Sequence, residues 1–303
     1  MSEKTNNTKK QKTTSPAVKA ILIIVIILCI GVIGFSAYKL ISTKLEYKKS
    51  RDEYDKLREY TTEKNTDTAA AGRVITVTAS DDSTPVDFEV VEAPGTSCPV
   101  EVDCKSLAEK NPDFAGWLYV EAVDISYPMV QGPDDDYYLH RTFEGTYNFS
   151  GSIFLESLCR KDFTTPVTIV YGHNMKDRSM FGSLKYLINE GMYTNSSYFW
   201  IVTEEHEYRY RFISLEHTDA YSDVYTVFNY PCEEAVSYMR DRVSHSHVSF
   251  NVPVLDLNSR IVVLSTCVGA DSPERFVVTG ILDMIDGEEI YDENGNFIER
   301  AED

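Results

Sequence analysis

The chain has 303 residues and an ordinary hydrophobic fraction, so it is long enough to form one or two folded domains. Residues 1–41 carry six basic side chains and one acidic side chain, whereas residues 42–303 carry 47 acidic and 23 basic side chains. An acidic excess of this size repels nucleic acid and anionic lipid, so we expect no nucleic-acid partner. The spacing of cysteine and histidine fits no zinc site, and the sequence indicates no metal and no cofactor.

The N-terminal region contains an uncharged apolar stretch, residues 20–37. At about 1.5 Å per helical residue this stretch reaches roughly 27 Å, and residues 40–41 complete a bilayer crossing beyond a snorkelling Lys39. A cleaved signal peptide is the alternative, but the stretch is long for one and no small-x-small cleavage site follows it. We therefore predict an N-terminal tail over 1–19 and a transmembrane anchor over 20–41. Basic residues flank both ends of this anchor, so their distribution does not decide its orientation.

A helical stalk and a flexible linker are predicted over residues 42–101. The segment 42–63 is highly charged and contains neither Pro nor Gly, which favours a helix continuing from the anchor, with a short coiled coil as the alternative. The segment 65–97 is rich in Thr, Asp, Ala and Ser and is interrupted by Pro and Gly. This composition is typical of a tether, in which we expect at most one short strand, at 87–91.

The remaining residues, 102–303, show the patterns of many short strands and few helices. Asp103 can cap a short helix that ends at Glu109, and helical patterns also cover 180–189 and 233–243. Strand patterns fall at 117–120, 125–131, 152–155, 167–171, 199–203, 208–215, 261–264 and 276–283. This arrangement indicates a β-barrel or a β-sandwich. Residues 292–296 superficially resemble a calcium loop, but the early glycine and the missing closing Glu favour a hairpin turn.

Six cysteines are scattered along the chain without the spacing of a disulfide framework. Cys98 and Cys104 could close a small loop, but free thiols are favoured because a chain of this size needs no disulfides for stability. Cys267 differs from the others because it directly follows the end of a predicted buried strand. A lone cysteine in that position is most often structural, so a nucleophilic role depends on its neighbours.

An imidazole and a guanidinium are predicted near the Cys267 thiol. Arg275 begins the next strand across one polar turn, and His173 follows the strand pattern at 167–171. A nucleophilic cysteine requires a thiolate, a proton carrier and a donor for the developing oxyanion. His173, Cys267 and Arg275 are therefore the predicted catalytic residues. Because an ordinary thiol (pKa about 8.5) and an ordinary imidazole (pKa about 6.5) are mostly uncharged together at pH 7, we expect slow turnover.

The motifs around these residues resemble those of class B sortases. The matching segments are 111–117, 127–131, 151–155, 171–175, 180–181 and 264–267, followed by Arg275. The resemblance implies a mainly-β catalytic domain over 102–303, built as an eight-stranded sortase-type β-barrel with a few helices and preceded by the transmembrane helix and stalk. It also implies that the helix at 233–243 is the long helix typical of class B, which walls the substrate groove.

The resemblance implies a membrane-anchored cysteine transpeptidase. Such an enzyme cleaves an Asn-Pro-x-Thr-x sorting motif after Thr in another surface protein and holds the product as a thioester on Cys267. It then joins that protein to an amine of a peptidoglycan precursor or a cell-wall cross-bridge. Because sortases act on the outer face of Gram-positive membranes, we expect a single membrane pass, a cytoplasmic N-terminus and an extracellular catalytic domain.

By the same resemblance, Tyr171, Ser265 and Thr266 are expected to line the substrate groove. Asp135 stands where class B relatives tend to have Asn, which replaces an amide donor to the sorting motif by a carboxylate. Two alternatives remain. One is a pilus-assembling sortase with a pilin lysine as acceptor, although this C-terminal tail lacks the second hydrophobic segment that such enzymes often carry. The other is a non-catalytic, membrane-tethered β-domain that binds a wall component.

Overall fold

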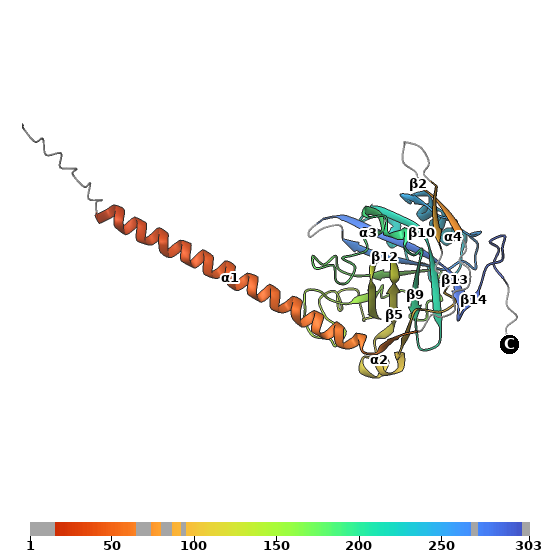
Figure 1. The fold of residues 1–303 in the computed structure, drawn as a ribbon, viewed down its shortest axis with the longest axis horizontal. Helices are drawn as coiled ribbons and strands as arrows, with labels where there is room; N and C mark the ends of the chain where they lie inside the picture. The colour runs from red at the N-terminus through yellow and green to blue at the C-terminus, as the bar shows by residue number, and fades with distance from the viewer. Residues whose placement is uncertain (1–15, 65–73, 80–86, 92–94, 268–271, 299–303) are drawn as a thin grey trace, which may run out of the picture. The chain divides into compact units, whose positions relative to one another are not determined.

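The computed structural model describes residues 16–64, 74–79, 87–91, 95–267 and 272–298. It divides into two units, Met1–Lys49 and Ser50–Asp303. Helix α1 (Pro16–Arg58) supplies the first unit, and its last turns belong to the second. The second unit contains all the strands (Figure 1).

Helix α1 contains the apolar stretch noted in the sequence. In the described part of the chain it is the one helix that is long and apolar enough to cross a membrane. The apolar side chains of this stretch are exposed: Leu28, Ile33 and Phe35 are 63%, 67% and 62% exposed. A long helical stretch that is apolar on all sides and exposed is consistent with membrane anchoring.

Eight strands close into a barrel, which confirms the predicted fold class. Their order is β10–β9–β5–β6–β7–β8–β12–β13, and β13 pairs back with β10 to close the cylinder. The strands are β5 (Phe114–Val120), β6 (Ile125–Val130), β7 (Ile153–Leu155), β8 (Val167–Tyr171), β9 (Tyr198–Val202), β10 (Glu207–Asp219), β12 (Ile261–Cys267) and β13 (Glu274–Ile285). Strand β14 (Glu288–Glu289) adds a short edge to β13. The pairs β6–β7 and β8–β12 are parallel, and the other pairs in the barrel are antiparallel.

Close packing inside the barrel explains the apolar strand patterns. All five residues of β9 are buried, and Phe199 stacks on Tyr210 of β10 with ring centroids 5.1 Å apart. Gly280 of β13 leaves room for this ring, because a Cβ there would lie 2.3 Å from Phe199. A larger residue at that position would force the aromatic core apart.

The helices confirm most of the sequence predictions. Helix α2 (Cys104–Lys110) is capped by Asp103, whose Oδ1 accepts a hydrogen bond from the Ser106 amide at 3.0 Å. Helix α4 (Glu233–Ser244) covers the segment predicted at 233–243. The described residues also form three 3₁₀ turns, η1 (Glu121–Val123), η2 (Met192–Thr194) and η3 (Asp223–Tyr225).

The prediction of a helix over 180–189 was wrong for its first half. Only α3 (Tyr186–Asn189) is α-helical in that segment. Met180 has φ = 53°, which a right-handed helix cannot accommodate. The Phe181 amide donates to the His173 carbonyl at 3.0 Å, so the backbone here is tied to the preceding loop.

The prediction of at most one strand in 65–97 was also wrong. Strand β2 (Val74–Ala79) pairs with β3 (Asp87–Val91) and with β11 (Val248–Ser249) in a three-stranded sheet. The partner in β11 lies more than 160 residues away in the sequence, so local composition could not reveal the pairing. Strand β1 (Thr61–Glu63) likewise pairs with β4 (Val100–Val102).

The segment after β14 forms the predicted hairpin turn. Tyr291 bridges Phe297, and the Asp292 carboxylate accepts hydrogen bonds from the amides of Asn294 and Asn296 at 2.9 and 2.8 Å. Gly295 occupies the left-handed region at φ = 78°, which explains the glycine in this turn.

Candidate active site

Strand register brings the three predicted catalytic residues to one end of the barrel. Ser265 of β12 is paired with Tyr171 of β8 in parallel, so Cys267 and His173 each follow this pair by two residues. On the other side of β12, Cys267 is paired with Arg275 of β13. Because paired backbones lie about 5 Å apart, the three residues leave adjacent strands at the same level. Of Cys267 itself, the structure describes the backbone only.

His173 is held by the loop that follows β6. Its Nε2 lies 2.7 Å from the carbonyl oxygen of Leu139. Because a carbonyl only accepts hydrogen bonds, Nε2 carries the proton and Nδ1 is the unprotonated nitrogen of the neutral ring. The His140 ring stacks on His173 with centroids 5.6 Å apart and an interplanar angle of 12°.

Burial lowers the pKa of His173 below its ordinary value of 6.5, and the neighbouring His140 adds to this effect. The hydrogen bond to Leu139 acts in the opposite direction but is smaller. The imidazole is therefore mostly neutral at pH 7 and can accept a proton through Nδ1.

Arg275 is partly used by the turn between β12 and β13. Its Nη1 donates to the Ser272 carbonyl at 2.8 Å and to the Glu274 carbonyl at 3.2 Å. Both bonds use the same nitrogen, so other N–H groups of the guanidinium remain to bind a carbonyl oxygen of a substrate.

Three other cysteines are unsuited to nucleophilic chemistry. Burial raises the pKa of Cys98 and Cys104 to about 12 and that of Cys159 to about 11. All three therefore stay protonated at physiological pH. Cys98 and Cys104 are both free thiols, which agrees with the favoured alternative for that pair.

Tyr171 and Ser265 are paired across β8 and β12, two residues before His173 and Cys267. A third residue, Tyr225 of η3, joins them: its ring stacks on Tyr171 with centroids 6.0 Å apart, and its hydroxyl lies 2.9 Å from the Ser265 Oγ. Tyr225 could not be identified from the sequence, because it lies 40 residues before its hydrogen-bond partner in a segment without a distinctive pattern.

Thr266 differs from Ser265 in the direction of its side chain. Successive residues of a strand point to opposite faces, so Thr266 does not share the face of Ser265 and Cys267. Its Oγ1 is buried and has no hydrogen-bond partner among the described residues. The structure therefore brings Tyr171 and Ser265 together but places Thr266 apart from them.

The half-buried Asp135 forms a carboxyl pair with the buried Glu156. Its Oδ1 accepts a hydrogen bond from the Ser157 amide at 2.7 Å, and its carboxyl group contacts that of Glu156. Glu156 is 7% exposed and accepts a hydrogen bond from the Tyr171 hydroxyl at 2.8 Å. Burial, followed by the contact with Asp135, raises the pKa of Glu156, since two carboxylates so close cannot both ionise freely. This pair ties the loop that holds His173 to the end of β7.

Helix α4 holds the segment that carries Tyr225. Arg242 is 1% exposed and forms ion pairs with Glu216 of β10 at 3.3 Å and with Asp223 of η3 at 2.9 Å. The Tyr238 hydroxyl donates to the carbonyl of Val224 at 2.7 Å. These contacts fix η3 against the barrel and thereby place Tyr225 over Tyr171.

Comparison with known proteins identifies relatives of one kind, although no family model matches the sequence. Sortase B of Listeria monocytogenes is 31% identical over 170 residues, which cover 55% of this chain and 68% of the relative. Sortase B of Staphylococcus aureus is 24% identical over 262 residues, which cover 86% of this chain and 96% of the relative.

Solved structures agree with these relatives. Sortase B of Clostridium perfringens superposes with a TM-score of 0.54 at 31% identity, covering 59% of this chain and 98% of that structure. A Bacillus anthracis protein described as similar to sortase B gives a TM-score of 0.58 at 26% identity, covering 78% of this chain and 96% of that structure. The chain therefore belongs to the class B sortases, a family of cysteine transpeptidases.

Proposed function

We propose that this protein is a membrane-anchored transpeptidase that cleaves an Asn-Pro-x-Thr-x sorting motif after Thr. The observation that carries the proposal is the register of β8, β12 and β13, in which Cys267 is paired with Arg275 and follows the Ser265–Tyr171 pair together with His173. A non-catalytic β-domain has no need to place a thiol, an imidazole and a guanidinium on adjacent strand ends.

In the first step, the Cys267 thiolate attacks the carbonyl carbon of the Thr residue in the motif. Arg275 donates hydrogen bonds to the oxygen that gains negative charge, and the His173 imidazolium gives its proton to the departing amine. The carbon–nitrogen bond breaks, and the protein with the new C-terminal Thr is held as a thioester. Tyr171 and Ser265 line the groove beside this bond.

In the second step, an amine of the cell wall attacks the thioester. His173 accepts a proton from this amine, the carbon–sulfur bond breaks, and Cys267 leaves as a thiolate. The product is a new amide bond between the surface protein and the wall. Because burial lowers the pKa of His173, only a small fraction of the enzyme holds the imidazolium that the first step requires at pH 7, and we expect slow turnover.

The domain boundaries form part of the proposal. We assign 1–19 to a cytoplasmic tail, 20–41 to a single transmembrane anchor, 42–101 to the stalk and linker, and 102–303 to the extracellular catalytic domain. The acidic surface of the last segment suits a position away from anionic lipid.

The test is a cleavage assay with the full-length chain in detergent micelles. Peptides with an Asn-Pro-x-Thr-x motif and peptides with a Leu-Pro-x-Thr-Gly motif are compared, and the products are identified by mass spectrometry. We expect cleavage after Thr in the first set and little in the second. Cleavage of neither set by a folded sample would leave the fold in place and reject the function.

A further inference from the structure

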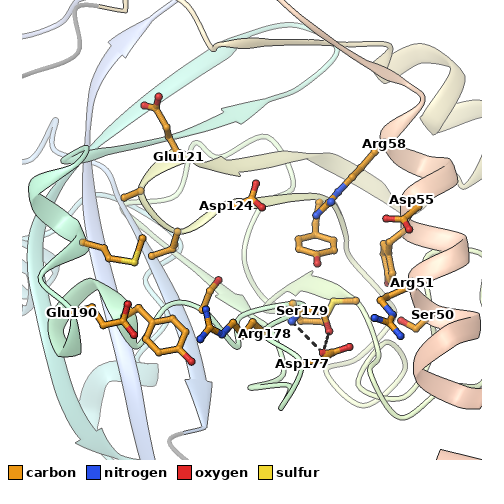
Figure 2. A pocket seen from close by; sticks show the side chains of 18 of the residues that line it. Ser50, Arg51, Asp55, Arg58, Glu121, Asp124, Asp177, Arg178, Ser179 and Glu190 are labelled. Carbon is orange, nitrogen blue, oxygen red and sulfur yellow. Dashed lines mark hydrogen bonds between the residues drawn. The ribbon is translucent and has the colours of Figure 1, made fainter. Parts of the chain in front are cut away.

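A cavity of about 590 Å³ lies in the second unit (Figure 2). Its walls come from four stretches of the chain: the end of α1, the turn around η1, the loop 177–183 and the stretch from α3 to η2. Its volume falls within the range of sites for small ligands and short peptides. None of the residues assigned above to catalysis or to the groove is among the described residues that line it.

Buried apolar and aromatic residues form the base of this cavity. Val123, Tyr127 and Met180 line it and are 5%, 7% and 1% exposed. Tyr127 packs edge-on against Tyr54 of α1, with ring centroids 5.4 Å apart. The base is therefore fixed by the protein core before any ligand enters.

Three arginines line the cavity, and in the described part of the chain none of them forms an ion pair: Arg51, Arg58 and Arg178. Arg58 lies over the Tyr127 ring at 5.3 Å, and Arg178 lies over the Tyr186 ring at 4.7 Å. Stacking on an aromatic ring orients a guanidinium but leaves its N–H groups available to an anion.

Acidic side chains also line the cavity and outnumber the arginines: Asp55, Glu121, Asp124, Asp177 and Glu190. Figure 2 shows Arg178 between Glu190 on one side and Ser50 and Arg51 on the other. A purely anionic ligand would be repelled by the carboxylate excess, and a purely cationic ligand would meet the three guanidinium groups. A ligand that carries both charges satisfies both sets.

The loop that borders the cavity starts at His173. The amides of Met175 and Phe181 both donate to the His173 carbonyl, at 3.1 and 3.0 Å, and Asn174 bridges Met180. This closes the segment 174–180 into a loop with His173 at its base and Arg178 on the cavity side. Arg178 and Met180 have φ of 70° and 53°, a costly conformation for residues with a side chain, so packing must hold the loop in this shape.

We propose that this cavity binds the non-reacting end of the acceptor, a short peptide that carries both carboxylate and ammonium groups. The inference rests on the proposed function, in which an amine of such a peptide must reach the thioester beside His173. Arg178 binds a carboxylate of the acceptor, and the acidic side chains bind its additional ammonium groups. The peptide backbone lies over the base formed by Tyr127 and Met180.

The first experiment measures the second step of the reaction in the full-length chain. The enzyme is acylated with an Asn-Pro-x-Thr-x peptide, and the thioester is then exposed to trialanine or to trialanine amide, which lacks the carboxylate. We expect trialanine to react roughly tenfold faster at limiting concentration, the effect of one charge-assisted hydrogen bond. Arg178→Gln should abolish this advantage, so that its thioester reacts with trialanine and with trialanine amide at equal rates.

Arg160→Gln is the matched control, because Arg160 is exposed, pairs with Asp162 and does not line the cavity. It should keep the full advantage of trialanine. If Arg178→Gln also keeps it, the proposal is overturned.

A second experiment separates this proposal from the proposed function. Binding of trialanine to the unacylated full-length chain is measured by saturation-transfer NMR, which requires no thioester. We expect the affinity to fall roughly tenfold in Arg178→Gln but not in Arg160→Gln. Equal binding by both variants would reject the cavity site even if the enzyme is active. Stronger displacement of trialanine by glycerol 3-phosphate than by trialanine amide would assign the cavity to a phosphate group and would also overturn the proposal.

Discussion

The strand-end site and the cavity are built in different ways. His173, Cys267 and Arg275 leave adjacent strands, so backbone register alone brings them together. The cavity takes its arginines from helix α1 and from the loop after His173, two segments more than 100 residues apart that are not paired by any sheet. A site that is formed by strand register can be predicted once the strands are recognised in the sequence. A site that is formed by packing of distant segments can be found only in the folded structure.

The substitution Cys267→Ala separates the two regions most completely. It removes the nucleophile, so peptide cleavage should fall by at least about a thousandfold, as is typical when a covalent catalyst is lost. Trialanine binding should not change, because none of the described residues that line the cavity lies on β12. The control is Cys232→Ala, since Cys232 is a partly exposed thiol before α4. Loss of cleavage in the control, or retained cleavage in Cys267→Ala, would contradict the assignment.

The support of the groove by α4 predicts a large loss of stability. In Arg242→Ala, Glu216 keeps its buried charge without a partner, so the free energy of unfolding should fall by about 3–5 kcal/mol. Urea unfolding followed by tryptophan fluorescence measures this change. The matched control is Arg240→Ala, an exposed residue of the same helix that donates to the Leu255 carbonyl at 3.2 Å. An equal loss in both variants would show that the ion pair of Arg242 is not the cause.

The role of Arg275 depends on the shape of its side chain as well as its charge. Lysine keeps the charge but lacks the planar fork, so Arg275→Lys should lower the acylation rate by about a hundredfold, close to the effect of Arg275→Ala. Stopped-flow or quenched-flow acylation measures this step. Near-normal acylation in the lysine variant would indicate that Arg275 contributes charge alone.

The pH dependence of acylation should show an acidic limb below pH 6.5. Burial lowers the pKa of His173, so the imidazolium becomes neutral imidazole at a lower pH than in an ordinary histidine. Below that pKa, His173 and Cys267 are both protonated. The fraction of enzyme that holds the thiolate then falls as the pH falls, so the acylation rate should drop about tenfold per pH unit. A limb that begins clearly above pH 6.5 would contradict the neutral, buried His173.

The carboxyl pair predicts the smallest effect, a change in the pH dependence of stability. Because the pKa of Glu156 is raised in the folded protein, its contribution is fully present below the unfolded value of about 4.5 and is lost as pH rises through the folded pKa. Glu156→Gln mimics the protonated form and keeps an acceptor for Tyr171. The variant should therefore lose less stability than the wild type between pH 4.5 and neutral pH, as measured by thermal unfolding. An identical pH dependence in both proteins would reject the raised pKa.

Much of the barrel could be predicted from the sequence, because apolar runs such as 261–264 indicate buried strands. The placement of His173, Cys267 and Arg275 could also be predicted, because residues at the ends of neighbouring strands share one edge of the sheet. The residues that hold this site in place could not be predicted. Glu156, Tyr225 and Arg242 act through partners that lie 15 to 40 residues away. The sheet formed by β2 and β11 was missed for the same reason, since its pairing is set by tertiary structure and not by local pattern.

In the proposed mechanism, Cys267 carries the acyl group between the two steps. The most direct measurement is the intact mass of the full-length chain after incubation with an Asn-Pro-x-Thr-x peptide in the absence of any amine, followed by proteolysis to locate the adduct. We expect an increase in mass equal to that of the acyl fragment ending in Thr, located on Cys267 and released by hydroxylamine. Peptide cleavage without such an adduct, or an adduct on another cysteine, would contradict it.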